Sequence, residues 1–184
     1  MGRRMKYRAL RQYLKNGGLI AYPTESCFGL GCDPMNRSAV KRLLRLKKRP
    51  QAKGLILIAS RMRQLKPYIA PLTPEQLNKT KATWPGPHTW LVPVNKHCPV
   101  WLSGKHPSIA VRITAHKGAR QLCQGVDMTL VSTSANRSGC KPAKTRRECQ
   151  RLFGASVKVL PGLVGKRRRP STIQDLATGR IIRK

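Results

Sequence analysis

The chain has 184 residues and a formal net charge of +32, with 38 lysines and arginines against only six aspartates and glutamates. This length and a hydrophobic content of 40% predict one domain with its own core, and argue against a disordered tail. The scarcity of carboxylates argues against paired-carboxylate catalysis and carboxylate-rich calcium sites.

A broadly positive surface attracts polyanions, so RNA is the first partner to consider. The six cysteines form no C-x-x-C pair, which argues against a zinc ribbon or a thioredoxin-like site. The sequence has no signal peptide and no apolar run of 18 residues, so we expect a cytoplasmic protein without membrane contact, its thiols reduced.

The first part of the chain alternates helical and strand patterns. Residues 5–16 predict an amphipathic helix that stops at two glycines, and residues 19–22 predict a short strand that ends at a proline. Residues 24–34 contain two glycines and no helical periodicity, so we expect a loop. Ligands bind beyond strand ends in open α/β sheets, which makes this loop a candidate site. Residues 37–47 predict the second helix.

Three cations follow that helix, before an apolar strand at 55–59. Lys47, Arg49 and Lys53 lie in a turn punctuated by proline and glycine. Lysine and arginine make strong charge-assisted bonds to phosphate oxygens, which favours a phosphate clamp. The alternative is that any turn of so basic a chain carries cations, and spacing alone does not separate the two.

The middle of the chain begins with a local helix signal. Thr73 as N-cap, proline next and glutamine three residues after the cap predict a helix to about residue 83. Residues 89–94 predict a strand whose proline indicates an edge strand or a strand end. Residues 109–113 predict another strand, in which Arg112 needs a partner or a solvent-filled site.

The last third predicts a helix at 117–124, a strand at 129–132, a helix at 144–153, a strand at 157–160, and strands near 172–175 and 180–183. After the strand at 129–132, residues 132–139 combine hydroxyls, an amide and a glycine, which suits either a ligand loop or an ordinary turn. The alternation of helices and strands predicts a single α/β domain over residues 1–184.

Six motifs occur in order along almost the whole chain. They are Tyr22-Pro23-Thr24-Glu25 through Phe28-Gly29-Leu30-Gly31, Lys47-x-Arg49-Pro50 with Lys53-Gly54-Leu55, Trp84-Pro85-Gly86-Pro87-x-Thr89, Val111-Arg112, Ser132-Thr133-Ser134-Ala135-Asn136-x-Ser138-Gly139, and Pro170-Ser171-Thr172-Ile173. In this order they resemble the threonylcarbamoyl-AMP synthase family (YrdC/TsaC). The resemblance implies a twisted, mixed α/β sheet with flanking helices around a positively charged concave face.

The resemblance also implies an activity: condensation of L-threonine, bicarbonate and ATP into threonylcarbamoyl-adenylate and pyrophosphate. The product would serve N6-threonylcarbamoylation of adenosine 37 in tRNAs that read ANN codons, through a downstream tRNA threonylcarbamoyl transferase complex. Magnesium would be held mainly by the ATP phosphates, with no metal site on the protein.

The residues implied for each role follow from the matching positions. Those implied for catalysis are Lys47 and Arg49. Those implied for ATP are Lys47, Arg49, Lys53, Ser132, Ser134, Asn136 and Arg183. Those implied for threonine are Thr24, Arg112 and Ser171.

Two other interpretations remain. The net charge of +32 also suits an RNA-binding or ribosome-maturation protein that uses a basic face of the same fold. A relative that transfers carbamoyl groups from carbamoyl phosphate is a lesser alternative, because such relatives usually carry this fold within longer, multidomain chains.

Overall fold

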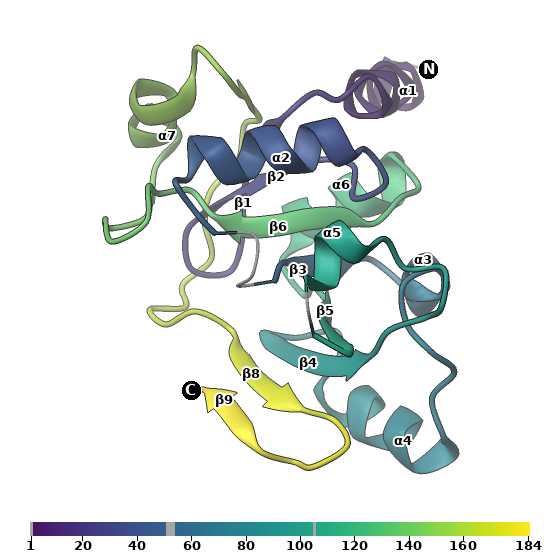
Figure 1. Cartoon of the computed structure of the whole chain (residues 1–184). Coiled ribbons are helices and arrows are strands. Elements are labelled where there is room, and N and C mark those ends of the chain that lie inside the picture. Colours follow the sequence, from purple (N-terminus) through teal and green to yellow (C-terminus); the bar gives the residue numbers. More distant parts are fainter. Residues whose placement is uncertain (1, 51–53, 105) are drawn as a thin grey trace.

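The computed structural model describes residues 2–50, 54–104 and 106–184, which fold around one mixed sheet (Figure 1). In the described residues the strand order is β7-β1-β2-β6-β3-β5-β4-β8-β9. Their bounds are β1 Ile20–Pro23, β2 Phe28–Gly31, β3 Ile56–Ala59, β4 His88–Pro93, β5 Ser108–Ile113, β6 Leu130–Ser134, β7 Lys158–Val159, β8 Thr172–Asp175 and β9 Ile181–Arg183. Three neighbouring pairs, β1–β7, β3–β5 and β4–β8, are parallel and the others antiparallel.

Helices lie on both faces of this sheet. Their bounds are α1 Gly2–Lys15, α2 Arg37–Leu46, α3 Met62–Leu65, α4 Pro74–Thr83, α5 Val100–Ser103, α6 Lys117–Gly125 and α7 Arg146–Phe153. Among the described residues, no helix is both long enough and apolar enough to cross a membrane. The mixed sheet with helices on both faces confirms the predicted mixed α/β class. The domain bounds 1–184 and the positively charged concave face stay predictions.

The sheet separates two clusters of buried side chains. Successive residues of a strand point to opposite faces, so Ile20 and Tyr22 join one cluster while Ala21 joins the other. The first cluster includes residues of α1 and α6, and the second includes the buried face of α2. In Figure 1, α2 accordingly crosses in front of β1, β2 and β6, with α6 behind them.

The prediction of a continuous loop over residues 24–34 is wrong, because β2 occupies Phe28–Gly31 and pairs with β1 and β6. Glycine is unfavourable in strands, so the two glycines of this segment concealed its strand pattern in the sequence. Here it permits close packing: a Cβ at Gly31 would lie 2.5 Å from the carbonyl oxygen of Val131. The sequence also did not predict the short helices α3 and α5.

Elsewhere the local signals were informative. The capping box at Thr73 and Gln76 is present at the start of α4. Pro93 is the last residue of β4, which pairs on both sides with β5 and β8, so the proline marks a strand end and not an edge. The strand expected at 129–132 continues to Ser134, which carries it into the predicted ligand loop.

Candidate functional site

A cavity of about 530 Å³ lies where the end of β1, the strands β5 and β6, and the C-terminal β8–β9 hairpin converge. This volume is in the range of small-molecule sites. The predicted site residues among its lining are Thr24, Arg49, Arg112, Ser132, Ser134, Ser171 and Arg183. Seven of the ten predicted residues therefore meet around one space. Lys47 and Asn136 are not among the lining residues, and Lys53 lies outside the described residues.

The turn after α2 sends neighbouring cations in different directions. Lys47 is the C-cap, and Lys48 adopts a left-handed backbone with φ of 51°. The Lys48 amide donates to the Arg45 carbonyl at 2.9 Å, and the Arg49 amide donates to the Leu44 carbonyl at 3.0 Å. These bonds form a Schellman motif. As a result Lys47 is only 3% exposed, Lys48 is exposed, and Arg49 lines the cavity.

The ammonium group of Lys47 binds the segment that follows β6. Its Nζ donates to the Ser134 carbonyl at 2.5 Å, to the Asn136 carbonyl at 2.8 Å and to Asn136 Oδ1 at 3.1 Å. Burial, together with the nearby charge of Arg49, lowers the pKa of Lys47 to about 8. Lys47 and Asn136, both implied as ATP contacts, are thus bonded to each other and are not among the residues that line the cavity.

Further hydrogen bonds fix the same segment. Ser134 Oγ donates to Asn136 Oδ1 at 2.6 Å, and Asn136 Nδ2 donates to the Cys140 carbonyl at 2.7 Å. The Ser138 amide donates to the Lys47 carbonyl at 2.9 Å. This leaves Ser134 at the cavity with a defined orientation.

Among the described cations of the turn after α2, Arg49 is the one that lines the cavity. Its Nη2 donates to the Gly54 carbonyl at 3.1 Å. Burial lowers the pKa of Arg49, but a guanidinium remains charged at neutral pH. Arg49 is therefore a permanent positive charge in the cavity wall.

A buried ion pair lies on the β5 side of the cavity. Arg112 Nη2 lies 3.3 Å from Glu25 Oε2, and the two side chains are 8% and 13% exposed. Glu25 Oε1 accepts a hydrogen bond from Thr114 at 2.8 Å. Burial by itself would raise the pKa of Glu25, but Arg112 and the Thr114 hydroxyl outweigh it and hold the pKa below its usual range. Arg112 thus has the partner that its position in a strand requires.

Thr24 is positioned beside this pair by the turn between β1 and β2. Its amide and its hydroxyl both donate to the Cys27 carbonyl, at 3.0 and 2.7 Å. The Thr24 Oγ1 lone pairs remain as acceptors at the cavity.

Ser171 and Arg183 form the third part of the wall. The guanidinium of Arg183 donates from Nε and Nη2 to the Ser171 carbonyl, at 3.1 and 2.9 Å, and Nη2 lies 3.2 Å from Ser171 Oγ. Ser171 Oγ also shares a hydrogen bond of 2.9 Å with Thr89 Oγ1. The structure therefore places Arg183, which was predicted to contact the nucleotide, against a residue predicted to bind threonine.

Three lining cations were not predicted as site residues: Lys141, Lys144 and Arg168. The first two follow the Ser132–Gly139 loop, and Arg168 belongs to the basic stretch 166–169. Only their proximity to a predicted loop, or local charge density, offered a signal. Within the described part of the chain, the lining contains no aspartate or glutamate, and no cluster of three His, Cys, Asp or Glu side chains could hold a metal ion.

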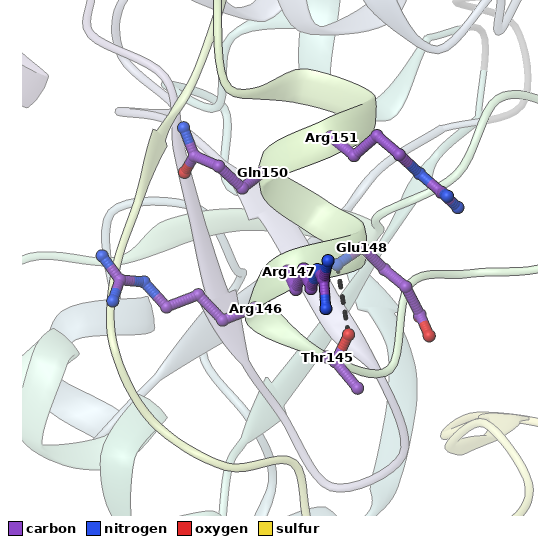
Figure 2. Close-up of a pocket in the computed structure, with 6 residues that line it drawn as sticks. All are labelled: Thr145, Arg146, Arg147, Glu148, Gln150 and Arg151. Carbon is purple, nitrogen blue, oxygen red and sulfur yellow. Dashed lines mark hydrogen bonds between the residues drawn. The ribbon is translucent and has the colours of Figure 1, made fainter.

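A second hollow lies around α7 (Figure 2). All six side chains drawn there belong to α7 or to its N-cap Thr145, whose hydroxyl accepts a hydrogen bond from the Glu148 amide at 3.1 Å. Several of them, including Arg146 and Arg151, extend away from the helix in different directions. No predicted site residue lies in this hollow, so it is the weaker candidate.

Known proteins resemble the chain over nearly its whole length. Residues 12–184 match the Sua5/YciO/YrdC family, described as "Telomere recombination". A threonylcarbamoyl-AMP synthase of Methylobacillus flagellatus is 62% identical over 97% of this chain and 99% of its own. A threonylcarbamoyl-AMP synthase of Thiobacillus denitrificans is 54% identical over 95% and 93%.

A solved structure of P. abyssi Sua5 complexed with L-threonine has a similar fold. It superposes with a TM-score of 0.85 at 28% sequence identity. The similarity covers 94% of this chain but 51% of the Sua5 chain, so this chain spans about half the length of that protein.

Proposed function

The chain belongs to the Sua5/YciO/YrdC family, and on this premise we propose that it is a threonylcarbamoyl-AMP synthase. It condenses L-threonine, bicarbonate and ATP into threonylcarbamoyl-adenylate, pyrophosphate and water, a cytoplasmic step toward modification of adenosine 37 in tRNAs that read ANN codons. The observation that carries this proposal is one cavity of about 530 Å³ lined by seven predicted residues. The names of the relatives favour this function over a purely RNA-binding role.

Threonine binds at the side of the cavity formed by Thr24, Arg112 and Ser171. Arg112 is a natural partner for the substrate carboxylate, because a guanidinium can donate two parallel hydrogen bonds to it. Thr24 Oγ1 has acceptor capacity left for the substrate amine or hydroxyl. The threonine-bound structure of the P. abyssi relative supports an amino-acid site in this fold.

ATP binds on the side formed by Arg49, Ser132 and Ser134, with Asn136 shaping the wall and Lys53 and Arg183 as further predicted contacts. The fixed charge of Arg49 neutralises the negative charge that builds up as the carbamate oxygen attacks the α-phosphate. Catalysis then consists of bringing the threonine amine, bicarbonate and nucleotide together and stabilising charge, without a covalent enzyme intermediate.

Magnesium would enter with the nucleotide and be held by its phosphates and water. The described lining offers hydroxyls and cations but no carboxylate, so the residues present do not fit a magnesium site built by the protein. Every step assigned to the protein therefore rests on its cations and hydroxyls.

Pyrophosphate release from ATP tests the activity directly. We expect release that requires both L-threonine and bicarbonate, with the adenylate as co-product detected by mass spectrometry. Arg49→Ala serves as the impaired variant, and Arg45→Ala removes an equal charge from the exposed face of α2 as its matched control. Failure of the folded wild-type protein to turn over would refute the proposed reaction.

We also propose that tRNA, or another RNA, contacts the basic surface, and that the adenylate is passed to a tRNA threonylcarbamoyl transferase complex. The six carboxylates are already engaged, as the bonds of Asp33, Asp127 and Asp175 illustrate. The six carboxylates therefore cannot neutralise all the exposed cations of α1, α2 and α7, and the remaining cations can contact a polyanion. RNA affinity that falls steeply with salt supports this contact, and affinity independent of salt contradicts it. The double variant Lys47→Ala with Arg49→Ala should abolish turnover and hardly change RNA affinity.

A further inference from the structure

Lys47 is already fully bonded within the protein. An ammonium group has three N–H donors, and Nζ meets three acceptors, all of them on Ser134 and Asn136. The side chain is buried and does not line the cavity, whereas Arg49, two residues away, does. The two cations of one turn therefore have different opportunities to contact a nucleotide.

We propose that Lys47 is a positioning residue that clamps the Ser134–Asn136 segment to the end of α2, and that it acts on the nucleotide through this segment and not by contacting phosphates. What the segment binds rests on the proposed synthase function. The clamp itself does not, because every contact in it lies within the protein.

The clamp has two parts, one from the backbone and one from the side chain. The Lys47 carbonyl accepts from the Ser138 amide, while its ammonium holds Ser134 and Asn136. A substitution at Lys47 removes only the second part. The Ser134 backbone is also supported by pairing between β6 and β2, where it lies opposite Gly29. We therefore expect loss of the ammonium to loosen residues 135–140 without detaching β6.

The orientation of Ser134 explains why such a clamp matters for binding. Its hydroxyl donates to Asn136 Oδ1, the same atom that accepts from Lys47, so the ammonium fixes the acceptor that fixes the hydroxyl. A free Asn136 side chain could turn away, and the Ser134 hydroxyl would lose its direction in the cavity wall. Such an effect weakens nucleotide binding in the ground state and the transition state alike.

Hydrogen exchange of the nucleotide-free protein tests the clamp. Lys47→Met keeps the apolar stem and removes the donors; Arg49→Met is the matched control, because it removes a neighbouring cation that lines the cavity. We expect Lys47→Met to speed exchange of the amides in residues 135–140 by roughly tenfold, since this segment loses local stability. Arg49→Met should leave the segment within twofold of the wild type, about the precision of the comparison.

The proposal is overturned if Lys47→Met leaves the segment as protected as in the wild type. Should Lys47→Met fail to fold, Lys47→Gln keeps two donors on a shorter side chain and should give a smaller increase in exchange. None of these measurements needs turnover, so a failed clamp and a failed synthase assignment give different results.

Kinetics then separate a clamp from a phosphate contact. For Lys47→Met we expect the KM for ATP to rise roughly tenfold with a smaller fall in kcat, as for loss of uniform binding, and partial recovery in Lys47→Gln. For Arg49→Met we expect the loss mainly in kcat. A fall in kcat at unchanged KM for Lys47→Met would assign it the direct role that the proposal denies.

Discussion

Two regions beside the cavity bury a cation in different ways. On β5, Arg112 lies against the carboxylate of Glu25, so that region is close to neutral. At the end of α2, Lys47 is surrounded by neutral carbonyl and amide oxygens, and Arg49 adds a second positive charge. The first region suits a zwitterionic amino acid, and the second suits a polyanion such as a triphosphate. The two sides differ less in their number of cations than in the partner of the buried one: Arg112 has an anionic partner, and Lys47 has neutral partners.

The largest effect should come from removing the positive charge of Arg49, which lines the cavity. Arg49→Ala removes a donor that stabilises charge in the transition state, and we expect turnover to fall by a factor of about 100 to 1,000. Steady-state pyrophosphate release measures it, with Arg45→Ala on the exposed face of α2 retaining activity. If turnover of Arg49→Ala falls by less than tenfold, the proposed role of Arg49 in stabilising transition-state charge is contradicted. The two regions would then not differ in their effect on catalysis.

The paired region should lose stability when either partner is removed. Arg112→Met leaves Glu25 buried without its cation, and Glu25→Gln leaves Arg112 without its anion; either should reduce the unfolding free energy by about 3 kcal/mol. The double variant should lose less than the sum of the two, because it leaves no unpaired charge. Urea unfolding measures all three. Additive losses would show that the pair at 3.3 Å is not energetically coupled.

Sequence patterns identified most of the fold and located the cavity, because the signals they use are local. Thr24 follows β1, Ser134 ends β6 and Ser171 precedes β8, and the structure brings these strand ends together. β2 could not be predicted in the same way, because its two glycines are explained by tertiary neighbours. A Cβ at Gly31 would lie 2.5 Å from the Val131 carbonyl oxygen, and one at Gly29 would lie 3.2 Å from Thr24 Cγ2.

Roles within the site were harder to predict than its location. Lys47, Lys48 and Arg49 are consecutive cations. The Lys47-x-Arg49 motif sets Lys48 apart, but it gives Lys47 and Arg49 the same role, whereas in the structure Lys47 is buried and Arg49 lines the cavity. The partner of Arg112 was equally hidden, because Glu25 reaches β5 only through the tertiary fold. Backbone geometry and long-range packing decide these roles, and neither can be predicted from the spacing of residues along the chain.

The difference between the pH dependence of stability of the wild type and that of Glu25→Gln should report the pairing of Glu25. Its pKa in the folded protein is lowered from 4.5, so its contribution is present above pH 4.5 and is lost as the pH falls through the folded value. The difference in unfolding free energy between the wild type and Glu25→Gln should therefore be constant near neutral pH and shrink below pH 4.5. Denaturant unfolding across this range measures it. A difference that grows on acidification would contradict the stabilising pair.

The smallest effect should come from the residue that separates Lys47 from Arg49. A non-glycine residue in the left-handed region is strained by about 1–2 kcal/mol, and glycine is the usual residue at this position of a Schellman motif. Lys48→Gly relieves that strain, but it also gives the unfolded chain more freedom, which offsets part of the gain. We therefore expect stabilisation of about 0.5 kcal/mol, measured by urea unfolding, with unchanged turnover because the Lys48 side chain is exposed. A loss of turnover in Lys48→Gly would mean that the strained turn itself sets the direction of Arg49.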